Sequence, residues 1–268
     1  MSIADKLTQI AENEQKVYDK GFSDGKATGG YTEGYEDGKQ AEYDAFWDAA
    51  QNYGTKGGYA RAFSGSSWNN QTFKPKYNII AGSNSYGAFC YSEYPGSLKE
   101  LLSTQGITLT FPNCSNIGDL FAHSKFTEIG ILDFSTVTAA APQYIFNGCS
   151  NLHTIEKIIL SQKVSFTFLG WFLSCKALEN IAFEGVIAND IDFSACTKLT
   201  KDSITNIIDH LSDTASGKTL TLSATAIYNA FGASPQDWDG DGNKEGWVGS
   251  QEWLDLISSK SNWTIVGI

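Results

Sequence analysis

A frame of phenylalanine, cysteine and leucine or isoleucine recurs along the middle of this chain, and it constrains the fold more than any other feature. The frame reads Phe-x-x-Cys-x-x-(Leu/Ile) and begins at Phe111, Phe146, Phe172 and Phe193. A weaker copy begins at Phe121 and has serine in place of the cysteine. Such self-similarity at a short period is typical of repeat proteins, so this part of the chain is predicted to repeat one structural unit.

Short strand-like runs lie between these frames and supply the spacing of the repeat. They cover residues 107–111, 131–134, 157–160 and 181–183, and their starts are 24, 26 and 24 residues apart. Leucine-rich repeats occupy about 20–29 residues. One such unit cannot bury its apolar face alone, so successive units stack. The spacing therefore predicts a solenoid with parallel strands, in which the Phe, Cys and Leu positions line up inside the stack.

The cysteines fit this interior better than they fit disulfides or a metal site. The chain has an odd number of them, far apart and without a C-x-x-C pair, and its opening residues do not resemble a secretory signal. We expect all five to be buried, reduced thiols that are neither catalytic nor redox-active: Cys90, Cys114, Cys149, Cys175 and Cys196.

Residues 1–50 differ from the rest in charge and pattern. They hold 11 Asp or Glu against 5 Lys, a net charge of −6 out of −11 for the whole chain. Ile3, Leu7, Ile10 and Val17 follow the core spacing of a coiled coil. A glycine recurs every four residues over 21–38, which suits either close helix packing or a flexible stalk. We interpret this segment as a helical arm for attachment or oligomerisation.

The other boundaries follow composition. Residues 51–95, rich in Tyr, Gly and Asn, are interpreted as a collar and N-terminal cap, and residues 96–200 as the repeats. Residues 201–268 are predicted to cap the stack with helices at 202–211 and 250–259 and strands at 219–223 and 263–266, with Asp202 or Ser203 as the first helix's N-cap. The predicted fold class is α+β: a leucine-rich-repeat solenoid with parallel strands, preceded by an N-terminal helical arm.

The frame Phe-x-x-Cys-Ser-x-Leu-x-x-Ile, which residues 146–155 match, resembles the irregular bacterial leucine-rich repeats of the BspA type. Residues 2–18, the Gly/Tyr-rich stretch, residues 73–77 and residues 199–204 resemble proteins carried by phages and prophages of Firmicutes. The resemblance implies a virion or cell-surface protein with an N-terminal attachment arm and a repeat body used for binding. It supplies no catalytic residues.

One segment resembles part of a calcium loop. Asp237, Asp239 and Asp241 are followed by Gly242, which matches positions 1, 3, 5 and 6 of an EF-hand, but position 12 is valine. The candidate calcium ligands are Asp237, Asp239, Asp241, Asn243 and Glu245, and the alternative is an acidic surface loop. If the loop binds calcium, the melting temperature rises with calcium relative to chelator, and an unchanged temperature refutes it.

Aromatic residues supply the candidate ligand surface. They make up 13% of the chain, with 7 Trp and 12 Tyr, and rigid aromatic rings give binding surfaces contact area at small entropic cost. Among those in the repeats, Phe166, Phe168 and Phe172 are predicted to fill the core. Tyr144 and Trp171 are predicted to be exposed and to contact a ligand.

Several functional classes are disfavoured. A net charge of −11 would repel nucleic-acid phosphates, no apolar run is long enough to insert in a membrane, and no motif of a common catalytic class is present. The predicted function is non-enzymatic: a phage virion or tail-associated protein that binds a host-surface glycan or protein, joins other virion proteins through residues 1–50 and forms a homo-oligomer. The alternatives are a bacterial cell-surface adhesin and a carbohydrate-active enzyme.

Overall fold

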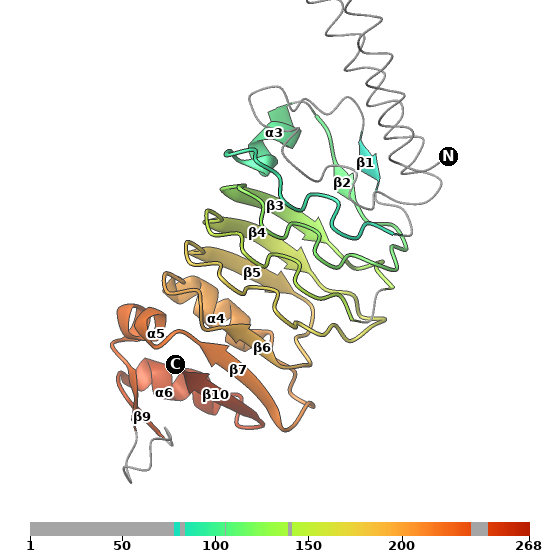
Figure 1. The fold of residues 1–268 in the computed structure, drawn as a ribbon. Coiled ribbons are helices and arrows are strands. Elements are labelled where there is room, and N and C mark those ends of the chain that lie inside the picture. Colours follow the sequence, from blue (N-terminus) through green and yellow to red (C-terminus); the bar gives the residue numbers. More distant parts are fainter. Residues whose placement is uncertain (1–77, 81–83, 105, 139–140, 237–245) are drawn as a thin grey trace, which may run out of the picture.

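The computed structural model describes residues 78–80, 84–104, 106–138, 141–236 and 246–268. Within them the chain winds into a solenoid of about four turns, followed by a mixed C-terminal unit (Figure 1). The elements in chain order are β1 (Ile79–Ile80), α3 (Leu98–Thr104), β2 (Leu109–Thr110), β3 (Glu128–Asp133), β4 (Thr154–Ile159), β5 (Asn180–Glu184), β6 (Ile191–Phe193), α4 (Lys201–Asp209), β7 (Lys218–Leu222), α5 (Ala224–Phe231), β8 (Ser234–Gln236), β9 (Gly246–Val248), α6 (Gln251–Ser258) and β10 (Trp263–Gly267).

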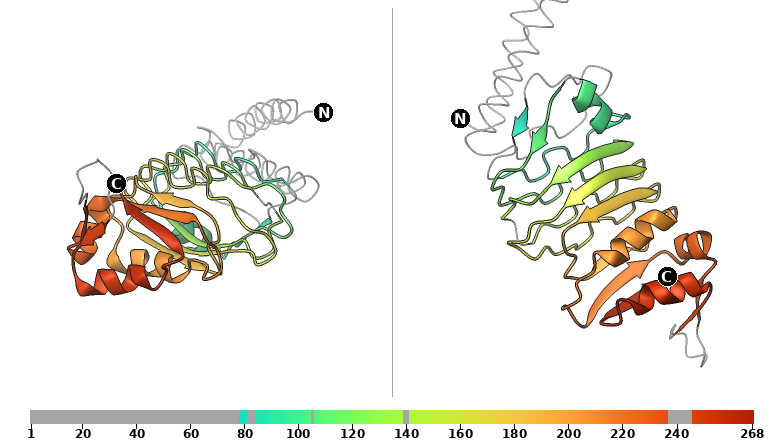
Figure 2. Two further views of the ribbon diagram at one scale, coloured as in Figure 1. Left: turned by 90° about the horizontal axis from the view of Figure 1, so that it is seen from below. Right: turned by 180° about the vertical axis from the view of Figure 1, so that it is seen from behind.

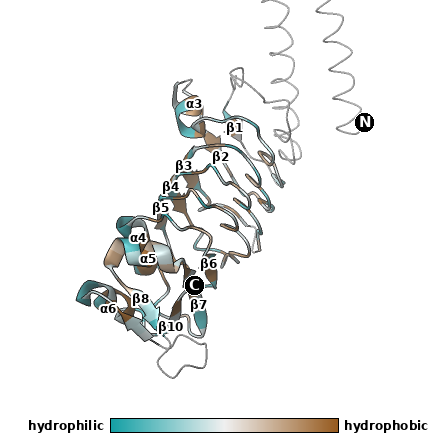
Figure 3. Cartoon of the chain, turned by 60° about the vertical axis from the view of Figure 1, so that its left-hand side comes forward, coloured by the Kyte–Doolittle hydropathy of each residue, from teal (hydrophilic) through white to brown (hydrophobic). Residues whose placement is uncertain are grey.

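The parallel strands expected near residues 131, 157 and 181 are confirmed as β3, β4 and β5. They form one sheet in that order, with Ile129 opposite Ile155 and Ile155 opposite Ile181. The run near 107 contains β2, which pairs with β1 in a separate sheet. Seen from behind, β3, β4 and β5 point the same way, one beyond the next (Figure 2), and each carries hydrophobic residues (Figure 3).

The segment that returns from one strand to the next forms no regular helix or strand. Its hydrogen bonds to the return segments of neighbouring coils, however, follow a regular pattern. Every second residue of it donates its amide to the adjacent coil, as Asp119 does to Gln143, Phe121 to Ile145 and His123 to Asn147. A residue with positive φ stands two positions before and two positions after the central phenylalanine of each coil: Gly87 and Tyr91, Asp119 and His123, Tyr144 and Gly148, Gly170 and Ser174. The left-handed conformation costs a non-glycine residue about 1–2 kcal/mol. The hydrogen bonds between coils offset this cost and hold these residues in that conformation.

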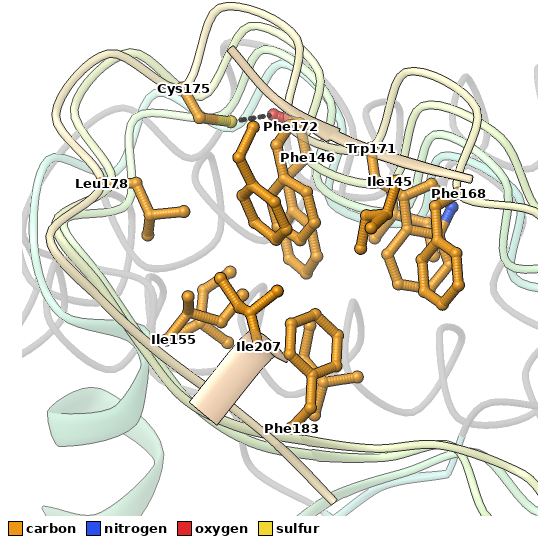
Figure 4. Close-up of a cluster of buried hydrophobic side chains, with 14 of the residues drawn as sticks. Ile145, Phe146, Ile155, Phe168, Trp171, Phe172, Cys175, Leu178, Phe183 and Ile207 are labelled. Carbon is orange, nitrogen blue, oxygen red and sulfur yellow. Dashed lines mark hydrogen bonds between the residues drawn. The ribbon is translucent and has the colours of Figure 1, made fainter. Parts of the chain in front are cut away.

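Five phenylalanines stack into a ladder through the core. Consecutive ring centroids are 5.2, 5.7, 5.6 and 4.4 Å apart with nearly parallel planes, along the series Phe89, Phe121, Phe146, Phe172 and Phe193. Figure 4 shows the rings of Phe146 and Phe172 above one another. The expected ladder is therefore confirmed for the frames that begin at residues 146, 172 and 193, and for the weaker copy at Phe121.

Two features of the ladder differ from the sequence interpretation. Phe89, which belongs to the segment assigned to the collar, is the first ring of the ladder, so the stack includes residues 84–95. The frame at Phe111 is not part of the ladder, because Phe111 directly follows β2 and packs edge-on against Phe134, which directly follows β3. Cys114 is buried as well, and its amide donates to the Phe111 carbonyl.

The cysteines are buried and reduced, as expected. Three of them form a second ladder in which each thiol reaches the carbonyl of a ladder phenylalanine in the preceding coil. Cys149 lies 3.0 Å from the carbonyl oxygen of Phe121, and Cys175 lies 3.1 Å from that of Phe146 (Figure 4); Cys196 lies 3.9 Å from that of Phe172. Burial raises the pKa of Cys149 to about 11 and also raises the pKa of Cys175 and Cys196. Protonated thiols are poor nucleophiles, so this ladder is structural.

Helix α4 closes the β5 edge of the three-stranded sheet. The Ile181 amide donates to Ser203 Oγ over 3.0 Å, and the Phe183 amide donates to Asn206 Oδ1 over 2.6 Å. An open strand edge would invite pairing with other chains, and these side chains occupy it. The predicted N-cap was wrong: Thr200 caps α4, and the Ser203 hydroxyl is used on the sheet.

Replacement of Asn206 by alanine is expected to lower the free energy of unfolding by about 1–3 kcal/mol, because the Phe183 amide loses its partner next to a buried side chain. Urea unfolding measures the change. Asn206→Asp keeps an acceptor oxygen and serves as the matched variant. If the alanine and aspartate variants are equally stable, the side-chain cap does not contribute.

The C-terminal unit continues the stack in altered form. Strand β6 pairs with β7 and β7 with β10, all parallel, while α4, α5 and α6 take the place of further strands (Figure 1). The helices and strands predicted in this unit are present within two residues of their expected bounds, and Ser250 caps α6. The sequence interpretation missed α5 and the antiparallel pair β8–β9. The arm at 1–50 and the calcium candidates at 237–245 lie outside the described residues.

Candidate functional site

Trp171 is not exposed, contrary to the sequence prediction. Its side chain is fully buried, its indole N–H donates to the Pro142 carbonyl over 2.8 Å, and its ring packs 4.8 Å from that of Phe168. The residue before each of the first four ladder phenylalanines is buried as well, as Figure 4 shows for Ile145 and Trp171. The left-handed residues on either side bend the chain so that two consecutive side chains enter the core. The alternation of a regular strand does not hold there.

Tyr144 lies at the surface of the return segments, half-buried and with a positive φ of 58°. Its ring covers Gly170 of the next coil so closely that a Cβ on Gly170 would lie 2.3 Å from it. Gly148 accommodates the ring of His123 at the same distance. Each ring therefore lies against a glycine of the following coil, which fixes its orientation.

A shallow hollow of about 230 Å³ lies among these rings. We call it the aromatic hollow, and it is lined by Cys90, Tyr91, Asp119, Ala122, His123, Tyr144 and Asn147. Tyr91 is 55% exposed, and its ring stacks on that of His123 with centroids 4.9 Å apart and planes 12° from parallel.

Polar groups stand beside these rings. The carboxylate of Asp119 accepts the Tyr86 hydroxyl, and the side-chain amide of Asn147 has no partner among the described residues. The sequence interpretation identified Tyr144 but missed Tyr91 and His123. Both stand two positions after a ladder phenylalanine, where the next two coils have Gly148 and Ser174. Contact of Tyr144 with a ligand stays a prediction.

A second, larger hollow lies where the repeats meet the C-terminal unit. This junction hollow has a volume of about 430 Å³ and is lined by residues 167–170, residues 189–192 and Lys218, Thr219 and Thr221 of β7. The sequence interpretation missed it entirely. Gly170 lines the junction hollow and also contacts the ring of Tyr144, which lines the aromatic hollow. The two hollows are therefore neighbours along the stack.

In the described part of the chain, no three His, Cys, Asp or Glu side chains gather as a metal site requires. No described helix has both the length and the apolar character to cross a bilayer. His153 Nδ1 lies 3.5 Å from Glu179, which also lies 3.9 Å from Lys198. The side chains of these pairs are 39–56% exposed, and such surface pairs contribute little to stability.

Comparisons of the chain with protein-family models, with curated proteins and with solved structures found no match.

Proposed function

We propose that this protein is a non-enzymatic binding protein whose repeat body takes a surface glycan in the aromatic hollow. The observation that carries the proposal is the exposed Tyr91 ring, which is stacked on His123 and has Tyr144, the Asp119 carboxylate and the Asn147 amide beside it. A sugar ring presents an apolar C–H face and a rim of hydroxyls. An aromatic face with donors and acceptors beside it complements both.

The rigidity of the hollow supports binding. Its rings belong to coils that hydrogen-bond to one another through the backbone, and His123 and Tyr144 rest on glycines. A surface that is already ordered loses little entropy when it takes a ligand. Such order suits the recognition of a flexible glycan chain, which itself loses entropy on binding.

The proposal of a binding role, rather than catalysis, is supported by how the reactive groups are used. Cys149, Cys175 and Cys196 are buried and protonated in the core, and the Asp119 carboxylate in the hollow already accepts a hydrogen bond from Tyr86. Hydrolysis of a glycan commonly needs two carboxyl groups facing each other across the scissile bond, and the aromatic hollow is lined by one.

The biological setting is proposed from the sequence resemblance. A repeat body of the BspA leucine-rich type, with an arm that docks to the particle or oligomerises, fits a phage virion or tail-associated protein that binds the host surface. Neighbouring genes for tail or baseplate parts favour this setting, and neighbours for cell-wall anchoring favour an adhesin.

A glycan array, followed by affinity measurements on the hits, tests the binding function. Tyr91→Asn removes the exposed ring but keeps a residue that tolerates positive φ, and we expect it to weaken binding by about tenfold or more, as for a central interface aromatic. Tyr228→Asn is the control, because Tyr228 is 62% exposed on α5 and does not line the hollow.

Mass spectrometry of the bound glycans separates binding from hydrolysis. The glycans are expected to be recovered intact. Undiminished binding by the Tyr91 variant would contradict the assigned surface, and cleaved products would contradict the non-enzymatic role. Binding to a host protein and to no glycan would contradict the ligand class.

A further inference from the structure

Polar side chains line the junction hollow, and hydrogen bonds within the protein occupy only some of their donors and acceptors. The Asn189 amide nitrogen donates to Ser165 Oγ and to the Phe166 carbonyl, over 2.7 and 2.8 Å. Asp190 Oδ1 accepts the Thr219 amide over 2.7 Å, and Asp192 Oδ1 accepts the Ser194 amide over 2.7 Å. These hydrogen bonds fix the three side chains in place. The side chains of Asn189, Asp190 and Asp192 each keep one oxygen atom without a partner among the described residues.

The remaining groups of the hollow include both donors and acceptors. The hydroxyls of Thr219 and Thr221 and the ammonium of Lys218 have no partner in the described part of the chain. The Thr167 hydroxyl is buried and makes no hydrogen bond there, which costs about 1–3 kcal/mol unless something satisfies it. Leu169 is 54% exposed at the same place and adds an apolar surface.

This combination selects a class of ligand. Each hydroxyl of a sugar both donates and accepts, so carboxylate and amide oxygens together with threonine hydroxyls can satisfy several of them, while Leu169 packs on C–H groups. An acidic ligand is disfavoured, because two aspartates face one lysine. An apolar ligand would leave the carboxylates and hydroxyls without water or partner.

We propose that the junction hollow is a second saccharide subsite, which takes a neutral sugar unit of the same glycan that the aromatic hollow binds. The proposal rests on the proposed function and extends it. Tyr144 and Gly170 connect the two hollows along the stack, and three coils at about 4.8 Å each place their centres roughly 15 Å apart. The glycan therefore lies along the solenoid axis, across successive coils.

Nuclear magnetic resonance on the full chain tests the subsite without knowledge of the natural glycan. Glucose, galactose, mannose and N-acetylglucosamine are titrated separately, with glucuronate as the acidic counterpart, and backbone amide shifts are followed. At least one neutral sugar is expected to shift the amides of Asp192, Thr219 and Thr221. Glucuronate is expected to shift them much less.

A pair of isosteric variants localises the effect. Thr221→Val removes a hydroxyl that lines the hollow, and Thr264→Val removes one from the neighbouring strand β10, outside the lining. The first is expected to weaken the sugar-dependent shifts at least threefold and the second to leave them unchanged.

The two proposals fail in different ways. Shifts confined to Tyr91, His123 and Tyr144 would overturn the junction subsite and leave the proposed function standing. Shifts at the junction hollow alone would support the subsite and remove the aromatic hollow from the proposed function. An absence of shifts with every neutral sugar, or a stronger response to glucuronate, would overturn the subsite.

Discussion

Replacement of Phe146 by alanine is expected to lower the free energy of unfolding by about 3–5 kcal/mol, as for other buried phenylalanines. Phe146 is fully buried at the centre of the ladder, 5.7 Å from the Phe121 ring and 5.6 Å from the Phe172 ring. Its loss removes two stacked contacts and leaves a cavity in a core held by neighbouring coils. A typical domain has only about 5–15 kcal/mol in total.

Urea and thermal unfolding measure this loss, with a fall in melting temperature on the order of 10 °C. Leu173→Ala is the control, because Leu173 is 51% exposed on the adjacent coil, and we expect a change within about 0.5 kcal/mol. Phe89→Ala is expected to cost less than Phe146→Ala, because Phe89 begins the ladder and has one stacked neighbour. Equal effects of the Phe146 and Leu173 variants would refute a core built on this ladder.

The comparison with the sequence shows what the frame Phe-x-x-Cys encodes. At Phe146 the amide of Cys149 donates to the Phe146 carbonyl, and at Phe111 the amide of Cys114 donates to the Phe111 carbonyl in the same way. The spacing therefore specifies a tight turn with a buried residue at each end. A solenoid coil has more than one such turn, so the motif predicts the turn but not its place in the coil.

The misplaced residues have a related cause. Phe89 has serine three residues later, as Phe121 does, and it also has Pro95 where the frame has leucine or isoleucine, so little of the frame is left to recognise. Trp171 was predicted to be exposed, but the positive φ values at Gly170 and Ser174 turn its side chain and that of Phe172 into the core. A non-glycine residue with positive φ, such as Ser174, leaves no clear sign in one sequence.

The two hollows differ in how far the sequence could reveal them. The rings of the aromatic hollow stand two positions before or two positions after a ladder phenylalanine, so an alignment of the coils by their inter-coil hydrogen bonds brings them together. The junction hollow joins Thr167, Asp192 and Thr221, which are ordinary polar residues far apart in the chain. Only the stacking of β6 and β7 on the repeats brings them together.

The stability of the protein is expected to fall steeply with pH above about 9, because of the buried thiols. Burial raises the pKa of Cys149 from its ordinary value of 9.0 to about 11, and also raises the pKa of Cys175 and Cys196. Below pH 9 the thiols are protonated in both states, and their contribution is fully present. Above pH 9 the unfolded chain releases protons that the folded chain retains, so unfolding is favoured.

The size of this effect follows from the proton count. Each thiol lowers the free energy of unfolding by about 1.4 kcal/mol per pH unit between its unfolded and folded pKa. For Cys149 the window runs from pH 9.0 to about 11, and inside it the three thiols together approach about 4 kcal/mol per pH unit as the unfolded thiols become fully ionised. Such a slope unfolds an ordinary domain within a few pH units.

Urea unfolding between pH 7.5 and 10.5 measures the slope, and a variant with alanine at Cys149, Cys175 and Cys196 isolates its cause. Lysines and tyrosines also titrate in this range, but they are common to both proteins, so the difference between the two curves belongs to the thiols. The variant is expected to be less stable at neutral pH and to have a flatter curve. If the triple variant does not fold, Cys149→Ala alone flattens the slope by about 1.4 kcal/mol per pH unit. Parallel curves would show that the thiols are not desolvated in the folded protein, which would contradict their place inside the coils.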